Sequence, residues 1–176
     1  MRGFSIQDLL LTMTDTTYNA LFICTGNSAR SILAEGLMNH LGAGRFRAWS
    51  AGSHPKGAVH PLALAVLAEH RIPTDGFRSK RWEEFAQPDA PQMDFVFTVC
   101  DQAAGEVCPV WPGQPMTAHW GMPDPAAVQG DADTQRRAFL DTFVTLQRRL
   151  RLMLSLPLAS LDALAIKKEI KDIGTR

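Results

Sequence analysis

Short apolar runs alternate with four-residue repeats of leucine along this chain, which is the pattern of strands alternating with helices. Residues 18–24 form a short, mostly apolar run that ends at a Gly-containing turn, so they predict a central strand buried on both faces. Leucines then recur at every fourth position and predict an amphipathic helix that begins near Arg30 and is stopped by the Gly-Ala-Gly of 42–44. Residues 45–51 predict a second strand. Strand, helix and strand together indicate a right-handed βαβ unit with parallel strands.

The rest of the chain continues this alternation. We expect a helix that begins at Pro61, a third strand over 94–99 and a less distinct fourth strand near 117–120. Large apolar residues at spacings of three and four predict a long helix over 131–154, followed by a short amphipathic helix within 160–174. These elements predict an α/β fold, an open four-stranded parallel sheet flanked by helices on both faces.

Length and charge favour one domain that acts on a small substrate. A chain of 176 residues fits one domain with short appendages, which we expect to be an N-terminal arm (1–17), a main domain (18–157) and a C-terminal helical tail (158–176). The 18 basic and 18 acidic side chains cancel, and no basic run indicates binding to nucleic acid or an anionic membrane. No apolar run approaches the roughly 20 residues of a membrane span, and no signal peptide is recognisable, so we expect a cytoplasmic protein.

The three cysteines are candidates for chemistry, because an odd number in a reducing compartment argues against a disulfide framework. Cys24 and Cys100 both follow predicted strands, at the carboxyl ends where open parallel sheets bind ligands. The loop after Cys24 leads into a helix, so its N–H groups can bind a tetrahedral oxyanion, to which Arg30 adds a planar fork. The same positive field favours the thiolate of Cys24; the competing interpretation is a buried cysteine that merely ends a strand. The predicted oxyanion-binding residues are Thr25, Gly26, Asn27, Ser28, Ala29, Arg30 and Ser31.

The segment "CTGNSARS" at 24–31 resembles the phosphate-binding loop of the low-molecular-weight protein tyrosine phosphatase fold. "HWGMPDPA" at 119–126 resembles the Asp-Pro motif of that fold, whose aspartate is the general acid. By this resemblance Asp124 protonates the departing oxygen, although the residues alone also fit a turn aspartate before proline. A third segment, "TVCDQAAGEVCPVWPG", resembles the redox segment of arsenate reductases built on this fold, and it carries Cys100 and Cys108.

The resemblance implies an arsenate reductase that converts arsenate to arsenite. Cys24 would form an arsenic adduct, Cys100 would attack the Cys24 sulfur, and Cys108 would then attack Cys100. An external thiol reductant, thioredoxin or a glutaredoxin and glutathione system, would restore the thiols. We expect no bound cofactor and no metal. Small residues after the Asp-Pro motif, with Tyr18 the only tyrosine of the chain, favour an inorganic anion over a phenolic ring.

Other interpretations stay open at this point. Cys100 and Cys108 fit two buried thiols, or zinc ligands together with His119, although their spacing matches neither common zinc pattern. A phosphomonoesterase, such as a low-molecular-weight protein tyrosine phosphatase, would use the first cysteine with Arg30 and Asp124 but neither later cysteine. A non-catalytic oxyanion sensor is the third possibility.

A cation site beside the loop is a further expectation from the resemblance. Family members that bind a cation there use carboxylate and polar groups, which Glu35, Asn27 and Ser50 match in this sequence. Lys80 stands where an acidic partner is expected. We therefore expect the Lys80 ammonium to take the place of the cation.

Overall fold

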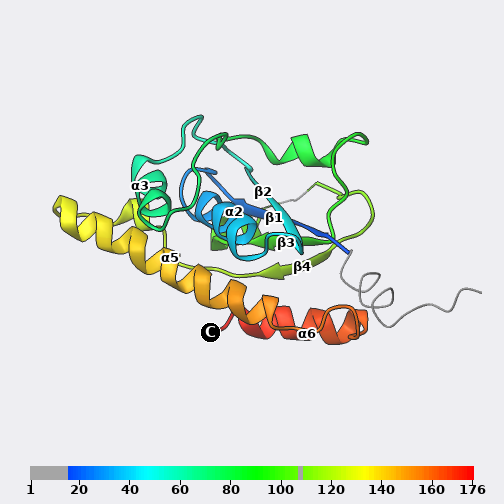
Figure 1. The fold of residues 1–176 in the computed structure, drawn as a ribbon. Coiled ribbons are helices and arrows are strands. Elements are labelled where there is room, and N and C mark those ends of the chain that lie inside the picture. Colours follow the sequence, from blue (N-terminus) through cyan, green and yellow to red (C-terminus); the bar gives the residue numbers. More distant parts are fainter. Residues whose placement is uncertain (1–15, 107–108) are drawn as a thin grey trace, which may run out of the picture.

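The computed structural model describes residues 16–106 and 109–176. Figure 1 shows the long helix α5 crossing one side of a sheet, with α6 beside it. In chain order the elements are β1 (Tyr18–Cys24), α2 (Arg30–Leu41), β2 (Phe46–Gly52), α3 (Pro61–Glu69), the 3₁₀ helix η1 (Trp82–Ala86), β3 (Phe95–Thr98), α4 (Asp101–Ala104), β4 (Met116–His119), the 3₁₀ helix η2 (Pro125–Ala127), α5 (Ala132–Leu154) and α6 (Ala163–Ile173).

The four strands pair in parallel in the order β2-β1-β3-β4, which confirms the predicted open sheet. β1 has a partner on each edge, and its residues from Ala20 onward are buried, as its apolar composition predicts. Because β1 and β3 are adjacent and parallel, their carboxyl ends bring Cys24 and Cys100 to the same edge of the sheet.

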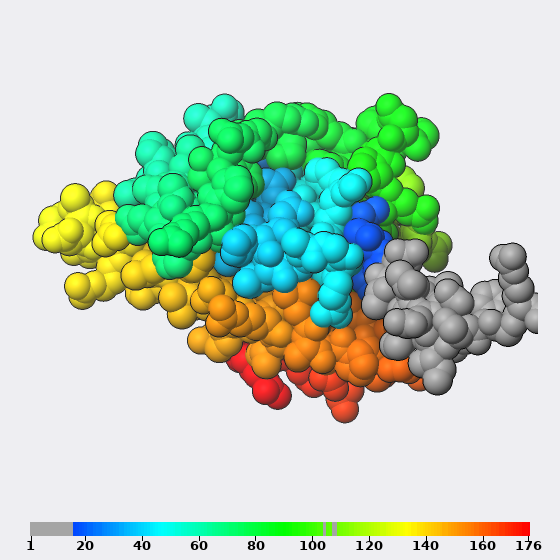
Figure 2. Space-filling view, in the orientation of Figure 1, coloured from blue at the N-terminus to red at the C-terminus, as the bar shows by residue number. Residues whose placement is uncertain are grey.

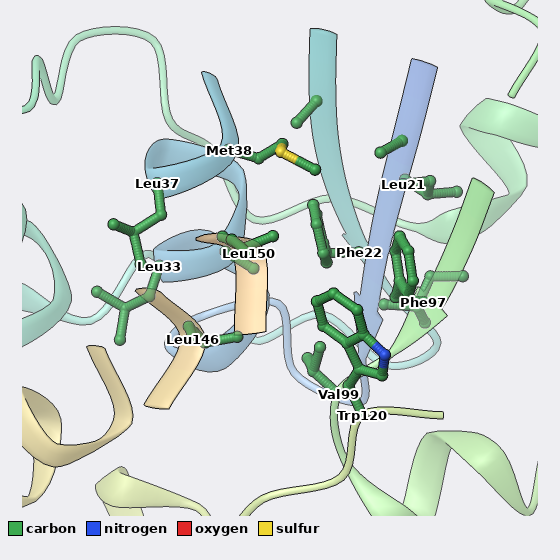
Figure 3. Packing of buried hydrophobic residues seen from close by; sticks show 14 of the residues in the cluster. Leu21, Phe22, Leu33, Leu37, Met38, Phe97, Val99, Trp120, Leu146 and Leu150 are labelled. Carbon is green, nitrogen blue, oxygen red and sulfur yellow. The ribbon is translucent and has the colours of Figure 1, made fainter. Parts of the chain in front are cut away.

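The hydrophobic core lies between the sheet and helices α2 and α5 (Figure 3). Phe22 of β1 stacks on Phe97 of β3 with ring centroids 5.2 Å apart, and the Trp120 ring lies 4.3 Å from that of Phe97. Leu146 and Leu150 of α5 belong to the same buried cluster. Trp120, which follows β4 and leads towards Asp124, is therefore anchored in the core.

Two features differ from the expectation. Helix α2 is not amphipathic, because every residue from Ser31 to Met38 is buried; α3 and α5 cover the sides of α2 that do not face the sheet. The second feature is η1, which the hydrophobic pattern does not indicate. Its Phe85 packs on Trp49 of β2, with ring centroids 6.5 Å apart.

Helix α6 packs on α5 and β4 through buried isoleucines, namely Ile166, Ile170 and Ile173. The indole N–H of Trp120 donates to the Ile170 carbonyl at 2.8 Å. In Figure 2, α5 (yellow to orange) and α6 (orange-red to red) together form the lower side of the molecule. Across 16–106 and 109–176, no helix combines the length and hydrophobicity that a bilayer span requires.

Candidate active site

The loop between β1 and α2 is held open by a buried asparagine. Asn27 is fully buried and adopts φ +43°, a left-handed conformation that asparagine tolerates better than most residues. Its side-chain amide donates to the hydroxyls of Ser31 at 2.8 Å and Ser50 at 3.0 Å, and its oxygen accepts from the Lys80 N–H at 2.9 Å. Gly52 lets the loop lie against β2, because a Cβ there would come within 2.6 Å of the Thr25 carbonyl. The loop is thus fixed from α2, β2 and the segment before η1.

Cys24 lies at the base of this loop and receives two hydrogen-bonding groups. Its Sγ accepts from the Asn27 N–H at 3.2 Å and lies 2.9 Å from Ser31 Oγ. Since Asn27 already donates its amide to Ser31 Oγ, the Ser31 hydroxyl hydrogen is free to point at the sulfur. The Cys24 sulfur is thus placed to accept two hydrogen bonds. Cys24 is 3% exposed and is a free cysteine.

Arg30, the first residue of α2, and Asp124, which caps η2, lie beside each other. One Arg30 amino group donates to the Met122 carbonyl at 3.0 Å, and the other lies 3.7 Å from Asp124 Oδ2. Asp124 Oδ1 accepts from the Ala126 N–H at 3.0 Å, which leaves the second oxygen for Arg30 or a substrate. The structure thus brings together the arginine and the aspartate that the sequence singled out, while Cys24 contacts Ser31, the residue next to Arg30. The Met122 carbonyl had no sequence signal, because it is a backbone group.

Cys100 meets the same loop from β3. Its Sγ accepts from the Thr25 N–H at 3.3 Å and from the Ala103 N–H at 3.4 Å, and it lies 3.5 Å from Thr25 Oγ1. The Thr25 amide, which was expected to hold the oxyanion, therefore donates to Cys100 in this structure. Cys100 is a buried free cysteine, as Cys24 is. Cys108 lies outside the described residues.

Lys80 reaches towards Glu35 behind the loop. Its ammonium lies 4.0 Å from Glu35 Oε1 and donates to the Arg78 carbonyl at 3.0 Å. Burial raises the pKa of Glu35, against the opposing effect of the Lys80 charge, and burial lowers the pKa of Lys80 against the effect of Glu35. Within 16–106 and 109–176, no group of three or more His, Cys, Asp or Glu residues could hold a metal ion.

His60 and His70 lie at the two ends of α3 and have structural contacts there. His60 caps α3 by accepting from the Leu62 N–H at 3.1 Å. Burial and the nearby Lys56 charge lower the pKa of His60, while Asp124 raises it in part. His70 stacks on Phe143 of α5 with ring centroids 4.1 Å apart.

Comparisons with known proteins place this site in a family. Residues 19–169 match the family model for low molecular weight phosphotyrosine protein phosphatases. The chain therefore belongs to the low molecular weight phosphotyrosine protein phosphatase family. Among its relatives are proteins named arsenate reductase. The one from Shouchella clausii is 34% identical over 119 residues, which cover 67% of this chain and 81% of the relative. Another, from Bacillus licheniformis, is 37% identical over 111 residues, which cover 62% of this chain and 75% of the relative.

Solved structures show the same fold. One described as an arsenate reductase in the phosphate binding state has a TM-score of 0.60 and 27% identity, covering 77% of this chain and 98% of that chain. A thioredoxin-dependent arsenate reductase from Corynebacterium glutamicum has a TM-score of 0.59 and 23% identity, covering 88% of this chain and 72% of that chain. The predicted phosphatase-like fold is confirmed by these similarities.

Proposed function

We propose that this protein is an arsenate reductase that converts arsenate to arsenite through Cys24, Cys100 and Cys108. The observation that carries the proposal is the contact of Cys100 Sγ with Thr25, the residue directly after Cys24. Phosphate ester hydrolysis needs one thiol, whereas arsenate reduction needs two electrons, which a pair of thiols supplies. The names of the relatives support the same activity.

In the first step the Cys24 thiolate attacks arsenic in a bound arsenate. An S–As bond forms and an As–O bond breaks, while arsenic stays pentavalent. Arg30 and the loop amides neutralise the negative charge of the anion, and Asp124 donates its proton so that the oxygen leaves as water. The 3.7 Å separation of Arg30 and Asp124 Oδ2 supports these two roles.

In the second step the Cys100 thiolate attacks Cys24 Sγ. The S–S bond forms as the S–As bond breaks, and the electron pair of that bond goes to arsenic, which leaves as trivalent arsenite. Cys108 then attacks Cys100 Sγ and displaces the Cys24 thiolate, so the oxidised product is a Cys100–Cys108 disulfide. An external dithiol, thioredoxin or a glutaredoxin and glutathione system, supplies the two electrons that restore the thiols.

A phosphomonoesterase is the second candidate function, favoured by the family match and by the proximity of Arg30 and Asp124. It would use both residues together with Cys24. This activity would release phosphate from a phosphorylated Cys24 with water as the second nucleophile. Only the reductase needs the two later cysteines. The two functions are therefore separable by variants at those positions.

The test measures both activities on the same variants. Arsenate-dependent NADPH oxidation is followed with thioredoxin and thioredoxin reductase, and separately with glutaredoxin, glutathione and glutathione reductase; p-nitrophenyl phosphate hydrolysis is measured beside them. Cys100→Ser and Cys108→Ser should abolish arsenate turnover and leave the slow hydrolysis, whereas Cys24→Ser should abolish both. Arsenate reduction at the parent rate by either of the first two variants would exclude the three-cysteine relay. Hydrolysis without any arsenate turnover in the parent would favour the phosphatase.

A further inference from the structure

One imidazole joins the two residues that flank the Cys100 position. His119, the last residue of β4, has Nδ1 2.8 Å from Thr98 Oγ1 at the end of β3 and Nε2 2.7 Å from Asp101 Oδ1 in the first turn of α4. A carboxylate only accepts hydrogen bonds, so Nε2 carries a proton and donates to Asp101. Thr98 and Asp101 stand on either side of Val99 and Cys100. The His119 imidazole therefore links the two ends of the short segment that carries Cys100.

The segment that leads to Asp124 packs against this hydrogen-bonded group. A Cβ at Gly121 would lie 2.4 Å from Asp101 Oδ1 and 2.5 Å from His119 Nε2. A side chain at 121 would displace the pair, so only glycine fits the observed packing. His119 thus lies where four parts of the chain meet: the ends of β3 and β4, the start of α4, and the segment from Gly121 that leads to Asp124.

Cys100 depends on this arrangement for its direction. Its sulfur accepts from the Thr25 N–H of the loop between β1 and α2 (residues 25–29, here called the anion loop) and from the Ala103 N–H of α4. The bond from Ala103 requires the first turn of α4 to stay in place. Helix α4 has only four residues, so its own hydrogen bonds hold it weakly. The bond from His119 to Asp101 ties that first turn to the sheet.

We propose that His119 is a positioning residue for the second thiol: through Thr98 and Asp101 it holds Cys100 against the anion loop until the segment rearranges to pair with Cys108. This inference rests on the proposed function. It assigns His119 a role in the disulfide-forming step and none in the attack of Cys24 on arsenic. His119 is thus neither a metal ligand nor a proton donor to substrate in this account.

A double-mutant cycle tests the pair. His119→Ala, Asp101→Ala and the double variant are made in a Cys108→Ser background, and formation of the Cys24–Cys100 disulfide after mixing with arsenate is followed by quenching and mass spectrometry. Each single variant should slow disulfide formation about tenfold, and the double variant should be no slower than either single one. His119→Gln, which keeps a donor near the Nε2 position, should recover part of the rate. Additive losses, or a parent rate in the single variants, would overturn the proposal.

Two controls separate local positioning from other causes. Asp133→Ala removes an exposed first-turn carboxylate from α5 and should leave the rate of disulfide formation unchanged. If Asp133→Ala slowed disulfide formation as much as Asp101→Ala, the effect of Asp101 would be explained by helix electrostatics alone. The rate of p-nitrophenyl phosphate hydrolysis should stay within about twofold of the parent rate in all variants. A loss of hydrolysis parallel to the loss of disulfide formation would show that His119 and Asp101 act on the segment that carries Asp124 and not on Cys100. Asp101 has a side chain 90% exposed, so its variant should fold even where His119→Ala does not.

A readout without arsenate keeps this inference distinct from the proposed function. In a Cys24→Ser, Cys108→Ser background, Cys100 is the one remaining thiol. Because Cys100 is 1% exposed in the structure, its alkylation by iodoacetamide should be slow in this background. His119→Ala and Asp101→Ala should each speed this alkylation about tenfold. If the parent makes no disulfide with arsenate but the alkylation rates rise, the proposed function fails and the positioning stands. Unchanged alkylation rates would overturn the positioning itself.

Discussion

Asn27→Ala tests whether one buried side chain holds the anion loop. The substitution leaves the buried Lys80 N–H without its acceptor and takes a donor from the hydroxyls of Ser31 and Ser50. An unpaired buried amide costs about 1–3 kcal/mol and each lost neutral hydrogen bond about 0.5–1.5 kcal/mol. Alanine at φ +43° adds about 1–2 kcal/mol. We expect the free energy of unfolding to fall by at least about 3 kcal/mol, a large part of the 5–15 kcal/mol of a typical domain.

Urea unfolding followed by tryptophan fluorescence measures this loss, with Asn27→Gly as the matched control. Glycine loses the same hydrogen bonds but adopts positive φ freely, so it should be about 1 kcal/mol more stable than the alanine variant. A loss of less than about 1 kcal/mol in Asn27→Ala would refute the hydrogen-bond reasoning. If Asn27→Ala and Asn27→Gly lost the same free energy of unfolding, the backbone strain assigned to alanine at positive φ would be refuted, but not the loss of hydrogen bonds.

Replacing sodium by potassium at equal ionic strength should leave the melting temperature unchanged, because the Lys80 ammonium already lies 4.0 Å from Glu35; a marked rise would show that a cation binds there. His60→Ala should cost about 0.5–2 kcal/mol through loss of the α3 cap. Since the pKa of His60 is lowered from 6.5, the unfolded state binds more protons as pH falls through that value, so the parent should lose stability in acid and the variant less; urea titrations at about pH 5.5 and about pH 7.5 compare them. Amide exchange over 101–106 should be faster in the Cys100–Cys108 oxidised form than in the reduced form, since a disulfide needs Cα atoms roughly 4.4–6.8 Å apart and we expect this approach to unwind the four-residue helix α4 that follows Cys100. Equal protection, with the disulfide verified by mass, would rule out unwinding.

Much of the fold is encoded locally and could be predicted. The continuous apolar run of β1 reflects burial on both of its faces, and the spacing of large side chains in α5 reflects one buried face. The burial of α2 on all sides depends on α3 and α5, and η1 depends on the contact between Phe85 and Trp49. Such long-range packing leaves no local period.

The candidate site divides in the same way. The loop from Cys24 to Arg30 is a contiguous motif, so its chemistry is readable from the sequence. The bonds that hold it join Asn27 to Ser50 and Lys80, which are 23 and 53 positions away. His119 and Asp101 are 18 positions apart on separate elements, and only the parallel pairing of β3 with β4 brings them together.

The central claim is that two thiols of this chain reduce arsenate, and a single turnover without reductant tests it most directly. Fully reduced protein is mixed with arsenate, arsenite is quantified, and the cysteine pairs are mapped by peptide mass spectrometry, with Cys100→Ser as the control. We expect arsenite in stoichiometric amount with a Cys100–Cys108 disulfide in the parent, and no arsenite in the control. Parent protein that keeps three free thiols and releases no arsenite would contradict it.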